Sequence, residues 1–201
     1  MEELTLLGER AVQAKYELQR MTTEKKNEVL EAVAEALIQN TEYLLLENHK
    51  DLERGIANQM NPGLVDRLRL TKERIAGMAE GIRQIVKLPD PVGEILDDYE
   101  AENGLHIVKK RVPMGVIGII YESRPNVTAD AFGLCFKSGS AVILKGGSDA
   151  IRSNMAITKV IQDAVVRRGV DPYVIQLIES TDRSVVNEFM KMKQYVDLLI
   201  P

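Results

Sequence analysis

The chain is poor in the residues that build disulfides and metal centres. Its 201 residues include one cysteine, Cys135, two histidines, His49 and His106, and no tryptophan. A single cysteine excludes an intramolecular disulfide framework and is typical of a protein from a reducing cytosol. Neither histidine has a partner at the spacing of metal ligands. We therefore predict a cytoplasmic protein without a metal site, and we interpret Cys135, which lies among apolar residues, as a buried side chain and not a nucleophile.

The sequence also lacks the marks of membrane and nucleic-acid proteins. Its first residues have neither the positive region nor the apolar core of a secretory signal, and no apolar run approaches the ~20 residues that span a bilayer. Acidic residues (30) outnumber basic residues (26), and the net charge is -4. Because the basic residues are interspersed with acidic ones, we expect neither a nucleic-acid partner nor a membrane partner.

The common phosphate-binding motifs are missing as well. The chain contains neither G-x-G-x-x-G after a predicted strand nor G-x-x-x-x-G-K-[ST]. Gly115 and Gly118 lie in or beside a predicted strand and not after it, so we interpret them as sites of close backbone packing. If this protein binds a nucleotide, it uses a different arrangement.

The first part of the chain has helical periodicity. Thr71 is a predicted N-cap, either Thr22 or Thr23 is another, and the helix after Thr71 is expected to stop before Pro89. Next comes a predicted hairpin from 94 to 112 with a type I′ turn at Asn103-Gly104, the pair that such turns favour. We predict a helical segment over 1–92, a hairpin over 93–112 and an α/β domain over 113–201.

From Gly115 onward, short apolar strands alternate with helices. This pattern predicts parallel strands with helical crossovers, and therefore an α/β fold with a doubly wound parallel sheet. The last strand, 196–200, looks buried from its composition. The expected elements are strands Val116–Ile120, Ala141–Leu144, Val174–Ile178 and Val196–Ile200 and helices Ala129–Ser138, Ala150–Arg168 and Arg183–Lys191.

Residues capable of chemistry stand where predicted strands end. Tyr121 to Asn126 follow one strand and Lys145 to Ser148 the next, and the carboxyl ends of parallel strands are where ligands bind. Asn126 is either an N-cap or a donor to a developing oxyanion, and Thr128 could be the cap instead. Lys145 either reaches water past apolar neighbours or contacts cofactor oxygens.

Glycines follow Lys145 directly. Gly146 and Gly147 leave backbone that ligand atoms can approach closely, and Ser148 or Asp149 is the expected cap of the next helix. Together with the preceding loop, this segment predicts a nucleotide-type cofactor site.

Four runs of residues resemble a known family. They are RVPMGVIGIIYESRPNVT from Arg111, KSGSAVILKGGSDA from Lys137, DRLRLT from Asp66 and GIRQIVKLPDPVG from Gly81. They are similar to the gamma-glutamyl phosphate reductases, also called glutamate-5-semialdehyde dehydrogenases, of the aldehyde dehydrogenase superfamily. The resemblance implies an NADPH-dependent reduction of L-glutamyl 5-phosphate to L-glutamate 5-semialdehyde with release of phosphate, a step of proline biosynthesis, through a cysteine thioester.

The resemblance also assigns roles to residues. It implies that Asn126 is the oxyanion donor and that Lys145 reaches the adenosine ribose. The segment that runs along the cofactor is implied to be Glu122, Ser123, Arg124 and Pro125, with Gly146, Gly147 and Ser148 completing the site. The absence of a carboxylate directly after the lysine would relieve repulsion of a 2′-phosphate and so favour NADPH.

The chain departs from the family in its length. Family members continue beyond the counterpart of Pro201 into a catalytic domain that bears the nucleophilic cysteine, so we expect the catalytic domain to be absent and the chain alone to be inactive. The resemblance further implies a homo-oligomer through the hairpin 93–112 and coupling to the upstream glutamate kinase. The alternative function is a non-catalytic nucleotide-binding or assembly module completed by another chain.

Overall fold

The N-terminal part of the molecule is helical. The computed structural model describes residues 2–122 and 124–201. Thr22 and Thr71 cap helices as predicted, because each side chain accepts a hydrogen bond from the backbone N–H three residues on. None of the described helices is long and apolar enough to cross a membrane. The helices are α1 (Glu2–Leu18), α2 (Thr23–Gln39), α3 (Thr41–Ala57), α4 (Pro62–Leu68) and α5 (Lys72–Lys87).

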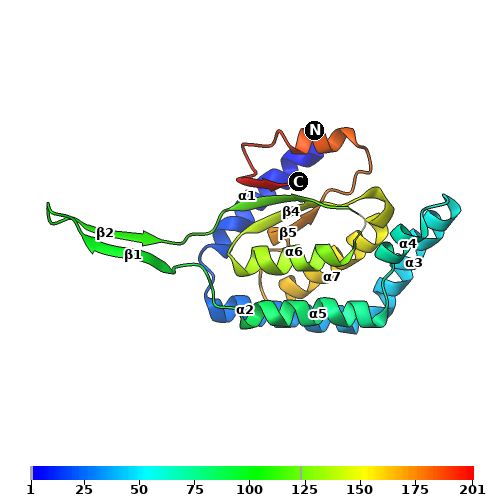
Figure 1. Cartoon of the computed structure of the whole chain (residues 1–201), viewed down its shortest axis with the longest axis horizontal. Helices are drawn as coiled ribbons and strands as arrows, with labels where there is room; N and C mark the ends of the chain where they lie inside the picture. The colour runs from blue at the N-terminus through cyan, green and yellow to red at the C-terminus, as the bar shows by residue number, and fades with distance from the viewer. Residues whose placement is uncertain (1, 123) are drawn as a thin grey trace.

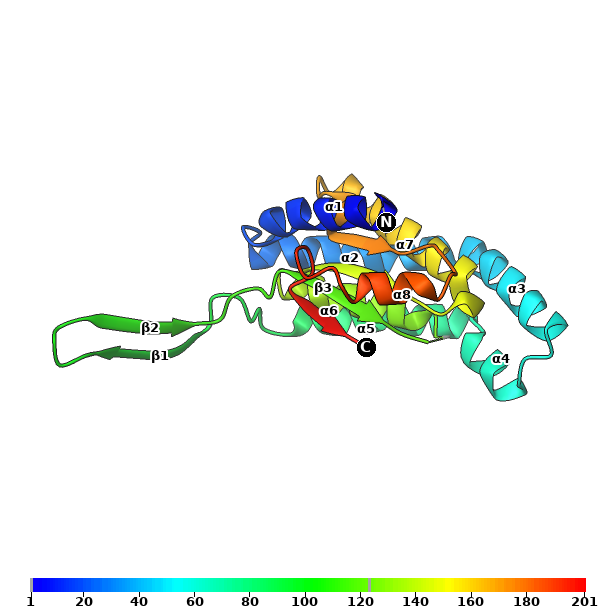
Figure 2. The same cartoon turned by 90° about the horizontal axis from the view of Figure 1, so that it is seen from above.

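A β-hairpin projects from the body of the molecule (Figures 1 and 2). Strand β1 (Ile95–Glu100) pairs with strand β2 (His106–Lys110) in antiparallel register. The predicted type I′ turn is wrong, because Gly104 has a φ of 82° whereas Asn103 is not among the described residues with positive φ. The tip is a longer loop closed by a hydrogen bond from the Ala101 N–H to the Leu105 carbonyl. It resembles the three-residue hairpin loops in which a glycine with positive φ follows a type I turn.

The rest of the chain forms the predicted parallel sheet. Its strands are β3 (Val116–Ile120), β4 (Ala141–Lys145), β5 (Ile175–Leu177) and β6 (Leu198–Ile200), and the order across the described sheet is β5-β4-β3-β6. Every pairing in it is parallel. The chain moves from β3 outward to β5 and then returns to the other side of β3. The loop after β3 therefore leaves the sheet where the strand order reverses, which is where such folds bind ligands.

Helices cover both faces of the sheet, which confirms the doubly wound prediction. Helices α6 (Asn126–Lys137) and α7 (Ile151–Arg167) pack on one face, and α2 and α5 form a further layer behind them (Figure 1). Helix α1 and the segment containing α8 (Ser184–Phe189) cover the other face. One apolar cluster runs from α1 and α2 through α6 and α7 to β5. The domain boundaries that we predicted at residues 92 and 112 remain predictions.

Close packing explains the two glycines near β3. A Cβ on Gly118 would stand 2.7 Å from the Phe189 ring, and a Cβ on Gly115 would stand 2.1 Å from the Asp197 carboxylate. Gly115 also has a φ of 113°, which side chains with a Cβ rarely adopt. Both glycines serve packing, as predicted.

Several predicted boundaries differ from the structure. Helix α6 begins at Asn126 and not at Ala129, and α7 begins at Ile151 after a 3-10 turn. The last strand is shorter than predicted and is not buried, because β6 is an edge strand in the described sheet whose end residues, Leu198 and Ile200, are exposed. Its apolar composition suggested burial that its edge position does not provide.

Candidate cofactor and substrate site

The segment that follows β3 separates two clefts. One, of about 380 Å³, is lined by the ends of β3 and β4 and by residues before α8, and we call it the strand-end cleft. The other, of about 400 Å³, lies between α4, α5 and the start of α6, and we call it the arginine cleft. Tyr121 and Glu122 line the first and Arg124 and Asn126 line the second. A molecule in either cleft would thus contact the same short loop.

Lys145 is the buried one of two cations that line the strand-end cleft, the other being Arg183. The Lys145 side chain is buried, with 6% of the residue exposed, although it lines the cleft. Its ammonium donates to the carbonyl of the adjacent Gly146 at 2.9 Å and makes no ion pair with the described residues. Burial lowers the pKa of Lys145. A buried ammonium without a carboxylate partner gains from an incoming oxygen ligand, so the geometry is compatible with both interpretations of Lys145.

Gly146 forms a wall of the strand-end cleft at a position where a side chain would clash with its neighbours. A Cβ at this position would stand 2.2 Å from the Asn154 amide nitrogen and 3.1 Å from the Tyr121 ring. The Tyr121 hydroxyl contacts the Thr128 hydroxyl at 2.7 Å, and Thr128 in turn donates to the Asn154 side-chain oxygen at 3.2 Å. This network fixes the loop after β3 against α6 and α7. Gly147 and Ser148 complete the wall.

Asn126 is not a helix cap. Pro125 occupies the N-cap position of α6 and Asn126 is the first helical residue, with no side-chain capping bond. Its amide instead donates to the Asp130 carboxylate, one turn further along α6, at 3.2 Å. Thr128 is not the cap either, because its hydroxyl belongs to the Tyr121 network. The oxyanion role of Asn126 stays a prediction, now without a competing capping role.

The arginine cleft was missed in the sequence analysis, although Asp66 and Arg67 stand in one of the quoted runs. Arg74 is paired with Asp66 at 3.2 Å. In contrast, the Arg67 and Arg124 side chains have no hydrogen-bonding partner within residues 2–122 and 124–201, and both residues are exposed. Asp130 is partly buried, and burial raises its pKa although the Asn126 amide opposes the shift. The cleft thus offers a carboxylate beside Asn126 and two guanidinium groups that have no partner among the described residues.

The loop after β4 is anchored from α3, which sequence reasoning also missed. Neither Ser148 nor Asp149 occupies the N-cap position of α7, because that position is taken by Ala150, which has no capping side chain. The fully buried carboxylate of Asp51 accepts hydrogen bonds from the Ser153 N–H at 2.8 Å and from the Ser153 hydroxyl at 2.7 Å. Arg54, paired with Asp51, donates to the carbonyls of Ser148 and Asp149. The cap of α7 is therefore supplied from a distant helix.

The remaining predicted site residues have varied surroundings. Glu122 lines the strand-end cleft and is exposed, Pro125 is buried, and Ser123 lies outside the described residues. Cys135 is buried in α6, and burial raises the pKa of its thiol to about 12. Because a thiol with that pKa is almost wholly protonated at neutral pH, Cys135 is a structural residue, as predicted.

Comparisons with known proteins agree with this architecture. Residues 2–199 match the aldehyde dehydrogenase family. The chain is 50% identical over 201 residues to the gamma-glutamyl phosphate reductase of Clostridium botulinum, covering 100% of this chain and 49% of that protein. It is 53% identical to that of Lachnospira eligens, covering 100% of this chain and 48% of the relative. The chain thus spans about half the length of the curated relatives it matches.

Solved structures show the same likeness. The crystal structure of gamma-glutamyl phosphate reductase from Thermotoga maritima superposes with a TM-score of 0.97 at 40% identity, covering 99% of this chain and 48% of that one. The corresponding protein from Saccharomyces cerevisiae superposes with a TM-score of 0.90 at 29% identity, covering 98% of this chain and 50% of that one.

Proposed function

Since the chain belongs to the aldehyde dehydrogenase family, whose members depend on nicotinamide cofactors, we propose that it forms the cofactor-binding part of a gamma-glutamyl phosphate reductase. Such an enzyme uses NADPH to reduce L-glutamyl 5-phosphate to L-glutamate 5-semialdehyde, with release of phosphate, in proline biosynthesis. The observation that carries the proposal is the pair of clefts on either side of the loop after β3. One suits a dinucleotide and the other suits a phosphorylated amino acid.

The strand-end cleft fits a dinucleotide. The Lys145 ammonium, which makes no ion pair with the described residues, is available to ribose or phosphate oxygens, and Gly146 leaves the backbone open to close approach. Glu122, Gly147 and Ser148 line the same space. Residues 146–148 carry no carboxylate, whereas Glu122, Asp149 and Asp182 elsewhere in the lining do. Lys145 and Arg183 supply the positive charge for the 2′-phosphate that distinguishes NADPH from NADH. A nicotinamide cofactor held there supplies the reducing equivalent.

The arginine cleft fits the substrate. L-glutamyl 5-phosphate carries an ammonium, a carboxylate and an acyl phosphate, and the cleft presents a group of opposite charge to each. We assign the substrate ammonium to Asp130, its carboxylate to Arg67 and its phosphate to Arg124. An ammonium would supply the cationic partner that the partly buried Asp130 lacks among the described residues. Arginine is suited to carboxylate and phosphate because it donates two parallel hydrogen bonds.

Asn126 lies at the substrate carbonyl in this arrangement. Its amide, which donates to Asp130, would turn to the oxygen that becomes negative when a thiolate attacks the acyl group. A donor placed there contributes about 3 to 4 kcal/mol to lowering the barrier in comparable acyl-transfer sites. The attacking thiolate is not Cys135, which is buried and protonated.

The cofactor half of the proposal is tested by titrating the chain with NADPH and with NADH and following nicotinamide fluorescence. We expect saturable binding with a preference for NADPH, and a loss of affinity of tenfold or more in Lys145→Met, because a charged hydrogen bond contributes about 1.5 to 3 kcal/mol. Lys87→Met, which alters an exposed lysine on α5, is the control. Equal affinity for both nucleotides would contradict the explanation for NADPH.

The substrate half is tested with L-glutamate, which shares the ammonium and carboxylate of the substrate. An NMR titration should shift the amides of Asn126 and Asp130, and Asp130→Asn and Arg67→Met should each weaken binding. D-glutamate and Glu80→Gln, an exposed carboxylate change on α5, are the controls. Shifts confined to other residues would remove L-glutamate from this cleft without affecting the cofactor result.

The hairpin is proposed as a contact between subunits. Ile95, Tyr99 and Val108 are exposed on a ribbon that packs on nothing else in the described chain, and exposed apolar ribbons mark interaction surfaces. Val108→Lys should lower the molar mass measured by light scattering, whereas Lys109→Gln should not. A cytoplasmic location and coupling to a glutamate kinase are further parts of this proposal.

A further inference from the structure

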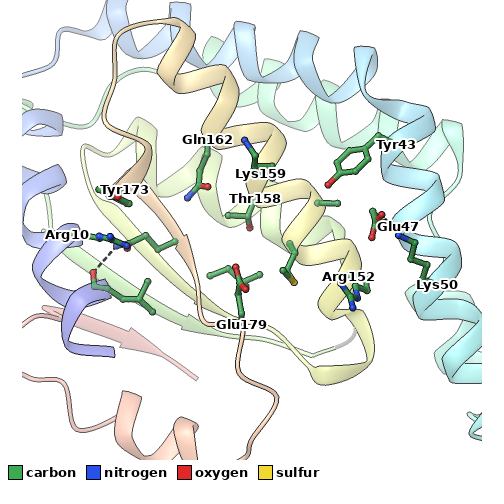
Figure 3. Close-up of a pocket in the computed structure, with 15 residues that line it drawn as sticks. Arg10, Tyr43, Glu47, Lys50, Arg152, Thr158, Lys159, Gln162, Tyr173 and Glu179 are labelled. Carbon is green, nitrogen blue, oxygen red and sulfur yellow. Dashed lines mark hydrogen bonds and ion pairs between the residues drawn. The ribbon is translucent and has the colours of Figure 1, made fainter. Parts of the chain in front are cut away.

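A third cavity lies at the edge of the parallel sheet that is formed by β5, opposite the edge formed by β6. It has a volume of about 570 Å³ and opens beside β5, between α1 on one side and α3 and α7 on the other (Figure 3). It shares no lining residue with the strand-end cleft or the arginine cleft. We call it the edge cavity; the residues that carry the argument are Arg10, Arg152, Thr158, Tyr173, Gln176 and Glu179.

Two residues that line the edge cavity carry buried polar atoms without hydrogen-bonding partners among the described residues. The hydroxyl of Thr158 and the side-chain oxygen of Gln176 have no hydrogen bond with the described residues, although Thr158 is only 5% exposed and Gln176 only 2%. The other polar atom of Gln176, its amide nitrogen, donates to the Leu7 carbonyl at 2.8 Å, so the oxygen is fixed as an acceptor. Buried polar groups are normally satisfied, and one that is not requires an explanation.

Charged groups without ion-pair partners lie in the same cavity. The Arg10 guanidinium stacks 4.5 Å from the centre of the Tyr173 ring, and neither it nor the Arg152 guanidinium pairs with a carboxylate in the part of the chain that the structure describes. The cavity lysines differ, since Lys50 pairs with Glu47 and Lys159 pairs with Asp163. Figure 3 shows Arg10 on one side of the cavity and Arg152 on the other, with Glu179 between them.

We propose that the edge cavity binds a free α-amino acid with an aliphatic side chain. A carboxylate matches an arginine, and an ammonium matches the Gln176 oxygen and the Glu179 carboxylate. An anion alone would leave the Gln176 acceptor unpaired, and a cation alone would leave the arginines unpaired. The apolar part of the ligand would contact Met155, Leu177 and the Tyr173 ring. This proposal is independent of the proposed function.

The test is an NMR titration of the chain with L-leucine and L-proline, which differ in size. We expect saturable shifts of the Thr158 and Gln176 amides. 4-Methylpentanoate, which lacks the ammonium, and isoamylamine, which lacks the carboxylate, should each bind at least tenfold more weakly than L-leucine. Failure of both amino acids to bind there, or equal binding of 4-methylpentanoate, would overturn the proposal.

Variants separate binding from folding. Thr158→Val should weaken amino-acid binding fivefold or more without lowering the unfolding temperature, because the hydroxyl has no partner in the free chain. Arg152→Met, an exposed change, should weaken binding tenfold or more. Ser140→Ala is the matched control, since Ser140 is another buried hydroxyl without a partner but does not line the cavity. Unchanged affinity in both Thr158→Val and Arg152→Met would contradict the assignment.

Discussion

Replacing Asp51 with asparagine should destabilise the start of α7 and, with it, the strand-end cleft. The Asp51 carboxylate is fully buried and accepts hydrogen bonds from Ser153, from the Arg152 N–H at 3.3 Å and from the Arg54 guanidinium at 2.8 Å. Arg54 in turn holds the Ser148 carbonyl at 2.8 Å. The change preserves the size of the side chain and removes only its charge and one acceptor.

The magnitude follows from these contacts. Both oxygens of Asp51 accept from donors, so the amide group of an asparagine meets a donor in either orientation. At least one charged hydrogen bond is lost, which costs about 1.5 to 3 kcal/mol, and a buried donor left unpaired costs about 1 to 3 kcal/mol more. The asparagine is easier to bury than a charge, which offsets part of the loss. We expect the free energy of unfolding to fall by about 2 to 4 kcal/mol.

Urea unfolding followed by circular dichroism measures this change. The midpoint should fall while the slope with denaturant stays constant, because the surface exposed on unfolding is unchanged. Asp163→Asn, an exposed change on α7 itself, should alter the unfolding free energy by no more than about 0.5 kcal/mol. A loss of less than about 0.5 kcal/mol in Asp51→Asn would refute the conclusion that Asp51 caps α7.

Other substitutions test the rest of the account. Gly146→Ala should lower the unfolding free energy by about 1 to 3 kcal/mol, since its Cβ would meet the Asn154 amide at 2.2 Å; an unchanged melting temperature would contradict this. Burial alone would raise the pKa of Asp90. The hydrogen bonds that its carboxylate accepts, the strongest of them from Lys26, lower the pKa by more, so the net pKa lies below the ordinary value. The stability contributed by Asp90 is therefore present above its ordinary pKa of about 4 and lost as pH falls through the lower folded-state pKa. Asp90→Asn should flatten the acid limb of stability against pH, whereas an unchanged limb would exclude this carboxylate. Thr71→Ala should cost about 1 kcal/mol through loss of the α5 cap, measured by urea unfolding, and no loss would show that the cap is dispensable.

Local chemistry explains which features the sequence analysis predicted. Thr71 caps the helix that begins directly after it, and the alternation of apolar strands with helices determines parallel pairing without further information. Lys145 could be placed at a ligand-facing strand end because the end of a parallel strand is also the end of its apolar run. Each of these inferences depends on residues that are neighbours along the chain.

Features that depend on distant contacts could not be predicted. Asp51 lies 102 residues from Ser153, from whose N–H it accepts a hydrogen bond as the cap of α7. Nothing near Ser153 in the sequence indicates that the cap of α7 comes from α3. The apolar composition of β6 does not reveal that it lies at an edge of the described sheet. Similarly, spacing alone could not distinguish a cap from a free amide at Asn126, because the answer depends on Pro125 taking the N-cap position.

The central claim is that the ends of β3 and β4 hold a nicotinamide dinucleotide, and amide-resolved NMR of the chain with added NADPH tests it most directly. We predict that the largest shifts occur at Gly146, Gly147 and Glu122 and that they saturate together. The control Lys87→Met should show NADPH-induced shifts of the same size. Lys145→Met should bind NADPH much more weakly. The account would be contradicted if NADPH shifted none of these amides, or if its shifts centred on residues of the edge cavity instead.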